Sequence, residues 1–112
     1  MRTLTQMSTQ VYKNQSNPRE LGNLYMELGA MYAFYSEKIK GIKVIKPAIW
    51  IGIKTSDGDK YLSDKFTEMK WRSTQEGMTE QNYKYELDGI NKLMDSIKQA
   101  AYLNHQEIKN LS

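Results

Sequence analysis

The chain has 112 residues, of which 39% are apolar and 26% are charged, and its formal net charge is +3. This length suits one domain of common size. Because cysteine is absent and there is a single histidine, the sequence excludes disulfides, thiolate chemistry and a histidine-rich metal site within one chain. No apolar run reaches the roughly 18 to 20 residues that a membrane span needs, and the polar residues 1–17 lack the core of a secretory leader. We therefore expect a cytoplasmic protein without membrane contact.

Residues 1–16 are rich in Thr, Gln, Ser and Asn and contain few apolar residues, which predicts a flexible N-terminal arm. The remaining residues 17–112 are expected to form a single helical domain. A helix start follows the arm directly: Asn17 can cap the helix, Pro18 occupies the first helical position, where no amide donor is needed, and Glu20 lies in the first turn.

The first long helix is expected to carry an apolar stripe with three- and four-residue spacing. Over residues 24–35 the apolar side chains point to nearly every side of a helix that turns by about 100° per residue. Such a helix must be covered on more than one side, so we predict a homo-oligomer. The interface residues expected on this helix are Leu28, Met31, Tyr32 and Tyr35.

Residues 42–54 (IKVIKPAIWIGIK) are compatible with two structures. Their β-branched content and the alternation of isoleucines favour a strand, with a short β-hairpin turning at Lys46 and Pro47. The heptad phase instead favours a helix that breaks or kinks near Pro47, because proline inside a helix costs about 3 kcal/mol. We prefer the broken or kinked helix, with the hairpin as the alternative.

Turn chemistry predicts a loop over residues 55–59. Asp57 and Asp59 resemble the start of a calcium-binding loop, but the closing glutamate of that pattern is missing, which favours an ordinary turn. Ser63 then caps a short helix over residues 64–72. The side chains that this helix is expected to bury are Phe66, Met69 and Trp71.

A capping box at residues 73–76 opens a second long helix that runs to about Asn110. It carries an apolar stripe with gaps of alternately four and three residues, which averages to about 3.5 residues, the repeat of helices packed along their length. The stripe consists of Tyr83, Leu87, Ile90, Met94, Ile97, Ala101, Asn104, Ile108 and Leu111. We therefore predict an all-α fold in which two long helices form a helical hairpin or coiled-coil-like bundle, with a short helix between them. The oligomer interface residues expected here are Leu87, Ile90, Met94, Ile97 and Asn104.

Asn104 is the polar member of this stripe, and two interpretations stay open. A polar residue in a helical core can fix register or oligomer state by pairing with its copy. Alternatively, the stripe drifts near the end of the helix and Asn104 is exposed.

The charges are unevenly distributed, with five lysines and no acid from Lys38 to Lys54. Residues 76–107, by contrast, hold six acids and three lysines. The basic segment suits an anionic partner, although a solvated charged face is the alternative. Lysines neutralise phosphates and an aromatic side chain stacks on an unpaired base, so single-stranded DNA is the expected partner. The expected contacts are Lys40, Lys43, Lys46, Trp50, Lys54 and Lys60, with core packing as the alternative role of Trp50.

Nothing in the sequence has the pattern of a catalytic site. A glycine-rich phosphate loop is absent, the glutamates at 76, 80 and 86 have no nearby histidine or nucleophile, and His105 has the setting of a surface or interface residue. We expect neither enzymatic activity nor a cofactor or metal site.

Residues 63–110 contain the motifs SDK, KW and QEG, then YELDGINKLMDSIK, then a polar tail with QEIKN. Together with the order of long helix, polar loop and long helix, these motifs resemble the UvsY-like recombination mediators of T-even bacteriophages over residues 21–110. The resemblance implies an oligomeric ring of helical subunits that binds single-stranded DNA inside an infected bacterium, with Lys54 and Lys46 at the DNA. It also implies that the protein helps a recombinase to displace single-strand binding protein. The chain departs from that pattern at Pro47, in its β-branched run and in its few arginines.

The alternative function is that of a small phage protein that inhibits a host protein by surface mimicry. Acidic residues of the last helix would then occupy a basic nucleic-acid channel of the host protein. The residues concerned are Glu76, Glu80, Glu86, Asp88 and Asp95.

Overall fold

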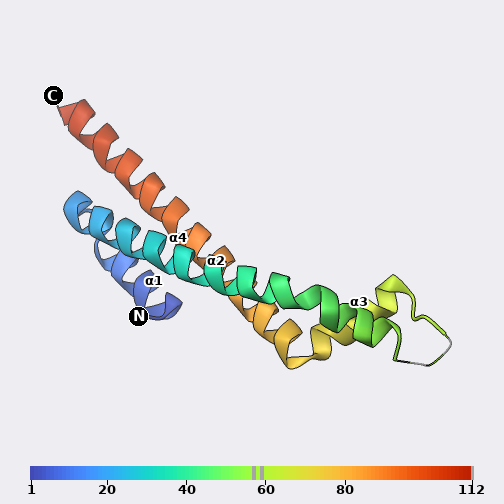
Figure 1. The fold of residues 1–112 in the computed structure, drawn as a ribbon. Helices are drawn as coiled ribbons and strands as arrows, with labels where there is room; N and C mark the ends of the chain where they lie inside the picture. The colour runs from blue at the N-terminus through green and yellow to red at the C-terminus, as the bar shows by residue number, and fades with distance from the viewer. Residues whose placement is uncertain (57, 59, 112) are drawn as a thin grey trace. The chain divides into compact units, whose positions relative to one another are not determined.

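The computed structural model is all-helical, which confirms the predicted fold class (Figure 1). It describes residues 1–56, 58 and 60–111, and the side chain of Leu111 lies outside this description. The helices are α1 (Leu4–Lys13), α2 (Pro18–Lys54), α3 (Asp64–Ser73) and α4 (Gln75–Leu111). The chain divides into two compact units, in which unit 1 comprises Met1–Phe34 with Glu86–Ser112 and unit 2 comprises Tyr35–Tyr85. Both long helices therefore contribute to both units: α2 gives residues 18–34 to unit 1 and 35–54 to unit 2, whereas α4 gives residues 75–85 to unit 2 and the longer part, 86–111, to unit 1.

The helix starts predicted at Pro18 and Ser63 are confirmed, because side-chain oxygens accept the free backbone N–H groups there. Asn17 Oδ1 accepts the N–H of Glu20 at 3.2 Å, and Ser63 Oγ accepts the N–H of Phe66 at 3.2 Å. Such caps satisfy donors that have no partner within the helix.

Helix α4 begins one residue later than the predicted capping box implied. Thr74 Oγ1, rather than Ser73, accepts the N–H of Gly77 at 3.0 Å. The same hydroxyl donates to the carbonyl of Trp71 at 2.6 Å, so Thr74 closes α3 and opens α4. The helix then runs to Leu111, as the sequence predicted to within one residue.

Unit 1 packs α1 against the N-terminal half of α2 and the C-terminal half of α4 (Figure 1). All three helices contribute side chains to its core. Gly89 of α4 allows a close approach of α1, since a Cβ at this position would lie 2.5 Å from Leu4 Cδ1. The buried apolar residues of unit 1 are Met7, Val11, Leu21, Leu24, Leu28, Met31, Ile90 and Ile97.

The structure differs from the flexible arm predicted for residues 1–16. A capping box in which Thr3 and Gln6 exchange hydrogen bonds starts α1, and Met7 and Val11 place an apolar pair at i and i+4 into the core. Arg2 also donates from Nε to Glu27 Oε1 at 2.9 Å and from Nη2 to Oε2. This hydrogen bonding lowers the pKa of the Glu27 carboxyl. Tertiary contacts thus order a segment whose composition alone predicts mobility.

In unit 2, α2 continues as a helix through Pro47 to Lys54, so the β-hairpin predicted as the alternative for residues 42–54 is wrong. Ile39 and Ile42, one helical turn apart, are buried on the same face. Pro47 and Lys43 are both exposed, so water can hydrate the carbonyl that loses its helical donor at a proline. The helical phase therefore outweighs the β-branched composition.

Of the three side chains that α3 was predicted to bury, Trp71 is buried, and the prediction is wrong for Phe66 and Met69. Thr67 and Trp71 are fully buried, whereas Phe66 and Met69 are exposed. Thr67 tolerates burial because its Oγ1 donates to the carbonyl of Ser63 at 2.8 Å. Between α2 and α3, Asp57 and Asp59 lie outside the described residues, and with them the possible cation loop considered in the sequence.

Candidate nucleic-acid interface

Unit 2 carries the whole net positive charge of the chain. Residues 35–85 contain ten lysines and arginines against seven acids, whereas the remaining residues contain six of each. An electrostatic attraction for polyanions would therefore act mainly through unit 2. Five of the six residues predicted to contact DNA lie on α2 within this unit, and Lys60 lies in the segment that follows.

Lys46 is held between two tryptophan rings in unit 2. Its Nζ lies 5.7 Å from the ring centroid of Trp50 and 5.3 Å from that of Trp71, and 3.7 Å from Glu68 Oε2. These distances are those of cation–π contacts combined with an ion pair. Lys46 follows the buried Ile39 and Ile42 on the same face of α2, and the two rings and the carboxylate explain how a lysine is accommodated there. We call Lys46, Trp50, Glu68 and Trp71 the tryptophan–lysine cluster.

The two tryptophans of the cluster have different environments. Trp71 is completely buried, and its Nε1 has no hydrogen-bond partner in the part of the chain that the structure describes. Trp50 is only half-buried. Trp71 is therefore a core residue, whereas Trp50 is only partly packed in the core and part of its side chain stays accessible.

An open hollow of about 340 Å³ borders the cluster. The exposed Lys43 and Pro47 lie at its rim, and the hollow is lined by Lys43, Lys46, Pro47, Trp50 and Glu68. The hollow thus combines the exposed cation of Lys43, the partly accessible indole of Trp50 and the ammonium group of Lys46, which lies between two rings. This combination can take a phosphate and a base that stacks.

The other predicted lysines divide into paired and open ones. Lys54 donates to the carbonyl of Leu62 at 3.0 Å and to Asp64 Oδ1 at 2.5 Å, and thereby connects the end of α2 to the start of α3. Lys40 lies 3.4 Å from Glu37 on the helix surface. Lys43 and Lys60 are exposed, and neither has a carboxylate partner recorded within the described residues.

The sequence prediction of this site missed Glu68 and, as a cluster member, Trp71. A signal for both was present, because Trp71 stands at i+4 from Thr67 and at i+3 from Glu68, the spacings at which helical side chains are neighbours. The prediction grouped Trp71 with Phe66 and Met69 instead, so its contact with Lys46 was missed.

Most residues predicted at an oligomer interface are covered within a single chain. Leu28, Met31, Ile90 and Ile97 are buried, Leu87 and Met94 are half-buried, and Tyr32 is exposed. Tyr35 packs its ring 5.6 Å from that of Tyr83 in unit 2. Leu28 and Met31 are thus buried in the core of unit 1, to which α1 also contributes Met7 and Val11.

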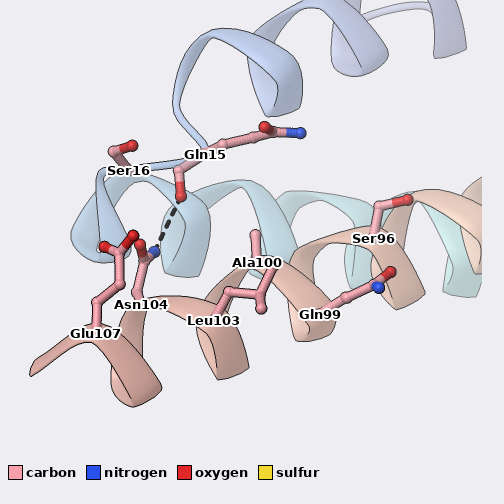
Figure 2. Close-up of a pocket in the computed structure, with 8 residues that line it drawn as sticks. All are labelled: Gln15, Ser16, Ser96, Gln99, Ala100, Leu103, Asn104 and Glu107. Carbon is pink, nitrogen blue, oxygen red and sulfur yellow. Dashed lines mark hydrogen bonds between the residues drawn. The ribbon is translucent and has the colours of Figure 1, made fainter. Parts of the chain in front are cut away.

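Asn104 contacts the turn between α1 and α2. Its Nδ2 donates to the backbone carbonyl of Gln15 at 2.9 Å, as Figure 2 shows. The surrounding hollow of about 340 Å³ in unit 1 is lined by amides, hydroxyls and small side chains, with Glu107 as its charged residue. Because it offers no cation, this hollow does not suit a phosphate.

The described part of the chain contains no group of three or more His, Cys, Asp or Glu residues that could hold a metal ion. None of its helices is both long and apolar enough to cross a membrane.

Comparison of the chain with protein-family models, with curated proteins and with solved structures finds no match. The resemblance to the UvsY-like mediators therefore stays a prediction from sequence motifs.

Proposed function

We propose that the protein is a single-stranded-DNA-binding accessory protein of phage-type recombination or replication, acting as a homo-oligomer. The observation that carries the proposal is the tryptophan–lysine cluster with its adjoining hollow, in the unit that contains the net positive charge. The resemblance to UvsY-like mediators extends the proposal to helping a recombinase replace single-strand binding protein on the strand. The expected setting is the cytoplasm of an infected bacterium.

The hollow suits a single strand better than a duplex because its aromatic residue needs an unpaired base. A base can stack on the accessible part of Trp50, while Lys43 contacts a neighbouring phosphate. Lys46 then strengthens the field at the hollow from a fixed position between the rings. Exposed aromatic residues near further lysines, Tyr61 beside Lys60 and Phe66 beside Lys65, extend this character over the loop and α3.

Fluorescence anisotropy with a labelled oligothymidylate of about 12 nucleotides tests DNA binding across salt concentrations. We expect micromolar or tighter affinity at low salt that weakens as salt rises. Trp50→Ala and Lys43→Ala should each weaken binding about fivefold or more. Lys92→Ala is the matched control for Lys43→Ala, since it removes an exposed lysine from unit 1. Absence of binding by the unmodified protein at low salt would refute the proposal.

Self-association is proposed through an exposed apolar stripe on α2. Its members recur every three or four residues along the helix, include no charge and are all exposed: Gly41, Val44, Ile45, Ala48, Ile51 and Gly52. We call this set the α2 stripe. The most exposed of the large ones, Val44, leaves 79% of its surface uncovered, which is unusual for a monomer when repeated along one face.

The α2 stripe is self-complementary in an antiparallel pair centred on Ala48. Val44 of one copy then faces Gly52 of the other, and Ile45 faces Ile51, so large side chains meet small ones or each other across a twofold axis. Light scattering should give a mass above the 13.1 kDa of one chain. Ile51→Glu should return the mass to that of one chain, whereas Met26→Glu, on the part of α2 in unit 1, should not. A monomeric mass for the unmodified protein contradicts this part of the proposal.

The alternative function, inhibition of a host protein through acidic mimicry, has less support from the geometry. Glu80 is buried and lies 3.5 Å from Lys84 Nζ, so it is not available to a basic channel. Glu76 and Glu86 are half-buried, which leaves Asp88 and Asp95 as the exposed acids of the predicted set.

A further inference from the structure

A second hollow of unit 2 contains none of the residues predicted to bind DNA. It measures about 480 Å³ and is lined by Arg72, Met78, Gln81, Asn82 and Tyr85. Arg72 comes from α3, and the other four come from the first turns of α4. The lining therefore includes one cation, one aromatic ring and two amides.

The four α4 residues form a single exposed face. Positions 78, 81, 82 and 85 stand at i, i+3, i+4 and i+7, which brings their side chains to the same side of a helix. All four are exposed, and Tyr85 leaves 64% of its surface uncovered. No partner is recorded for the amides of Gln81 and Asn82 among the described residues. An aromatic ring and two amides without partners are thus presented together.

Arg72, which lines this hollow, forms an ion pair with Glu68. Its Nε lies 3.5 Å from Glu68 Oε1, while 68% of its side chain is accessible. An ion pair at Nε leaves the two terminal nitrogens of the guanidinium available as donors. Because the same Glu68 carboxylate pairs with Lys46, one acidic residue connects this hollow with the tryptophan–lysine cluster.

We infer that this hollow binds an adenine base of a single strand, with the phosphate beside it held by Arg72. The inference rests on the proposed function, which it extends from binding of single strands in general to base preference. Tyr85 provides a stacking surface for the base. The carboxamide of Asn82 or Gln81 presents a donor and an acceptor side by side, which match N7 and N6 of adenine. A pyrimidine has no N7 and can pair with the carboxamide only through its Watson–Crick edge, and it covers less of the tyrosine ring than a purine does. The preference for adenine therefore depends on stacking and hydrogen bonding together.

The arrangement also explains why base recognition falls to α4 and not to α2. The side chains around the tryptophan–lysine hollow are cations, an indole, a proline and a carboxylate. The cations attract any strand through its phosphates, which carry no sequence information. The adjacent donor and acceptor of an amide match an adenine edge, and exposed amides of this unit gather at the second hollow.

Anisotropy measurements with three labelled oligonucleotides of about 12 nucleotides test the inference. The first is oligothymidylate, and in the other two every third nucleotide is dA or dC. We expect the unmodified protein to bind the dA-containing strand about tenfold more tightly than the other two. Asn82→Ala should abolish most of this preference while leaving affinity for oligothymidylate unchanged. Tyr85→Ala should weaken binding of all three strands about fivefold or more.

Matched controls exist on the same helix. Asn91→Ala removes an exposed amide from α4 in unit 1, and Tyr102→Ala removes a tyrosine that is 62% exposed. Both controls should keep the affinity and the preference of the unmodified protein. Helical circular dichroism should be equal for all variants, since each replaced side chain is exposed.

The outcomes separate this inference from the proposed function. Equal binding of the three strands by the unmodified protein overturns the adenine site but leaves DNA binding intact. A preference for dA that survives both Asn82→Ala and Gln81→Ala overturns the assignment of the amides. If the unmodified protein binds none of the three strands, both the proposed function and the adenine site are wrong.

Discussion

Gly77 is the position at which a single added methyl group should disturb unit 2 most. An alanine Cβ there would lie 1.9 Å from the carbonyl oxygen of Trp71 and 2.8 Å from its carbonyl carbon. Carbon and oxygen atoms normally approach to about 3.3 Å. Because the obstructing atoms belong to the backbone, no side-chain rotation relieves the overlap, and the first turn of α4 must move away from α3.

The net effect of Gly77→Ala combines two opposing contributions. Alanine favours the helix over glycine by about 1 kcal/mol. Overpacking costs about 1–3 kcal/mol, and moving the turn also strains the Thr74 cap, which is worth about 1 kcal/mol. We therefore expect the free energy of unfolding to fall by about 1–3 kcal/mol. Gly41→Ala is the control, since a Cβ there meets nothing within 4 Å in its own chain. Because Gly41 belongs to the α2 stripe, both variants are compared at a protein concentration at which light scattering gives the mass of one chain. Under these conditions Gly41→Ala should raise the free energy of unfolding by about 0.5–1 kcal/mol.

Urea denaturation followed by tryptophan fluorescence measures this difference. Trp50 and Trp71 both belong to unit 2, as do both glycines, so the signal reports the unit that is perturbed. The denaturation midpoint of Gly77→Ala should lie below that of the unmodified protein, and that of Gly41→Ala above it. A midpoint for Gly77→Ala equal to or above that of Gly41→Ala would show that the junction of α3 and α4 is not packed as described.

Three further predictions concern other contacts. Asn104→Ala should lower the free energy of unfolding by about 1 kcal/mol through loss of its bond to the α1–α2 turn, without changing the mass in light scattering; Asn91→Ala should change neither. Arg2 lowers the pKa of the Glu27 carboxyl in the folded state. The contribution of the Arg2–Glu27 pair to the free energy of unfolding is therefore complete above the ordinary glutamate pKa of about 4.3, and it is lost as the pH falls through the lower pKa of the folded state. Urea midpoints measured in this acid range should therefore fall less steeply for Glu27→Gln than for the unmodified protein. Lys46→Met should keep the free energy of unfolding within about 1–2 kcal/mol of that of the unmodified protein, because an apolar side chain can replace a part-buried ion pair. Anisotropy should nevertheless show weaker oligonucleotide binding by this variant.

Local chemistry made the helix starts predictable from the sequence. Asn17 and Ser63 cap their helices through hydrogen bonds to the N–H groups three residues further on, and Pro18 fixes the backbone of the first helical position. These effects do not depend on the rest of the fold. The same holds for α1, whose start at Thr3 and Gln6 has the form of a capping box. That signal was outweighed by the polar composition of residues 1–16, although two apolar residues at i and i+4 are enough to anchor a short helix.

The features that the sequence could not supply are those that depend on contacts between helices. The cost of Pro47 was estimated for an isolated helix, but the helix here is held on both sides of the proline. Lys46 is fixed before it by the tryptophan–lysine cluster, and Lys54 is fixed after it by Asp64 and Leu62. Likewise, the contribution of Met7 and Val11 to the core of unit 1 was missed because α1 was not counted as a helix.

The pairing of the lysines bears directly on how DNA binding should respond to salt. Lys40, Lys46 and Lys54 each have a carboxylate within 4 Å, so binding a phosphate there exchanges one anion for another. Such an exchange releases fewer counterions from the strand than neutralisation by an unpaired lysine, because the displaced carboxylate must regain cations of its own. Five equivalent lysines would give a slope of log affinity against log salt of about −3.5 for a single strand. Lys43 and Lys60, which have no carboxylate partner among the described residues, would alone give about −1.4. A slope near the smaller value would mean that the carboxylates keep their lysines and that the tryptophan–lysine cluster acts as a preformed surface, with its affinity coming largely from stacking.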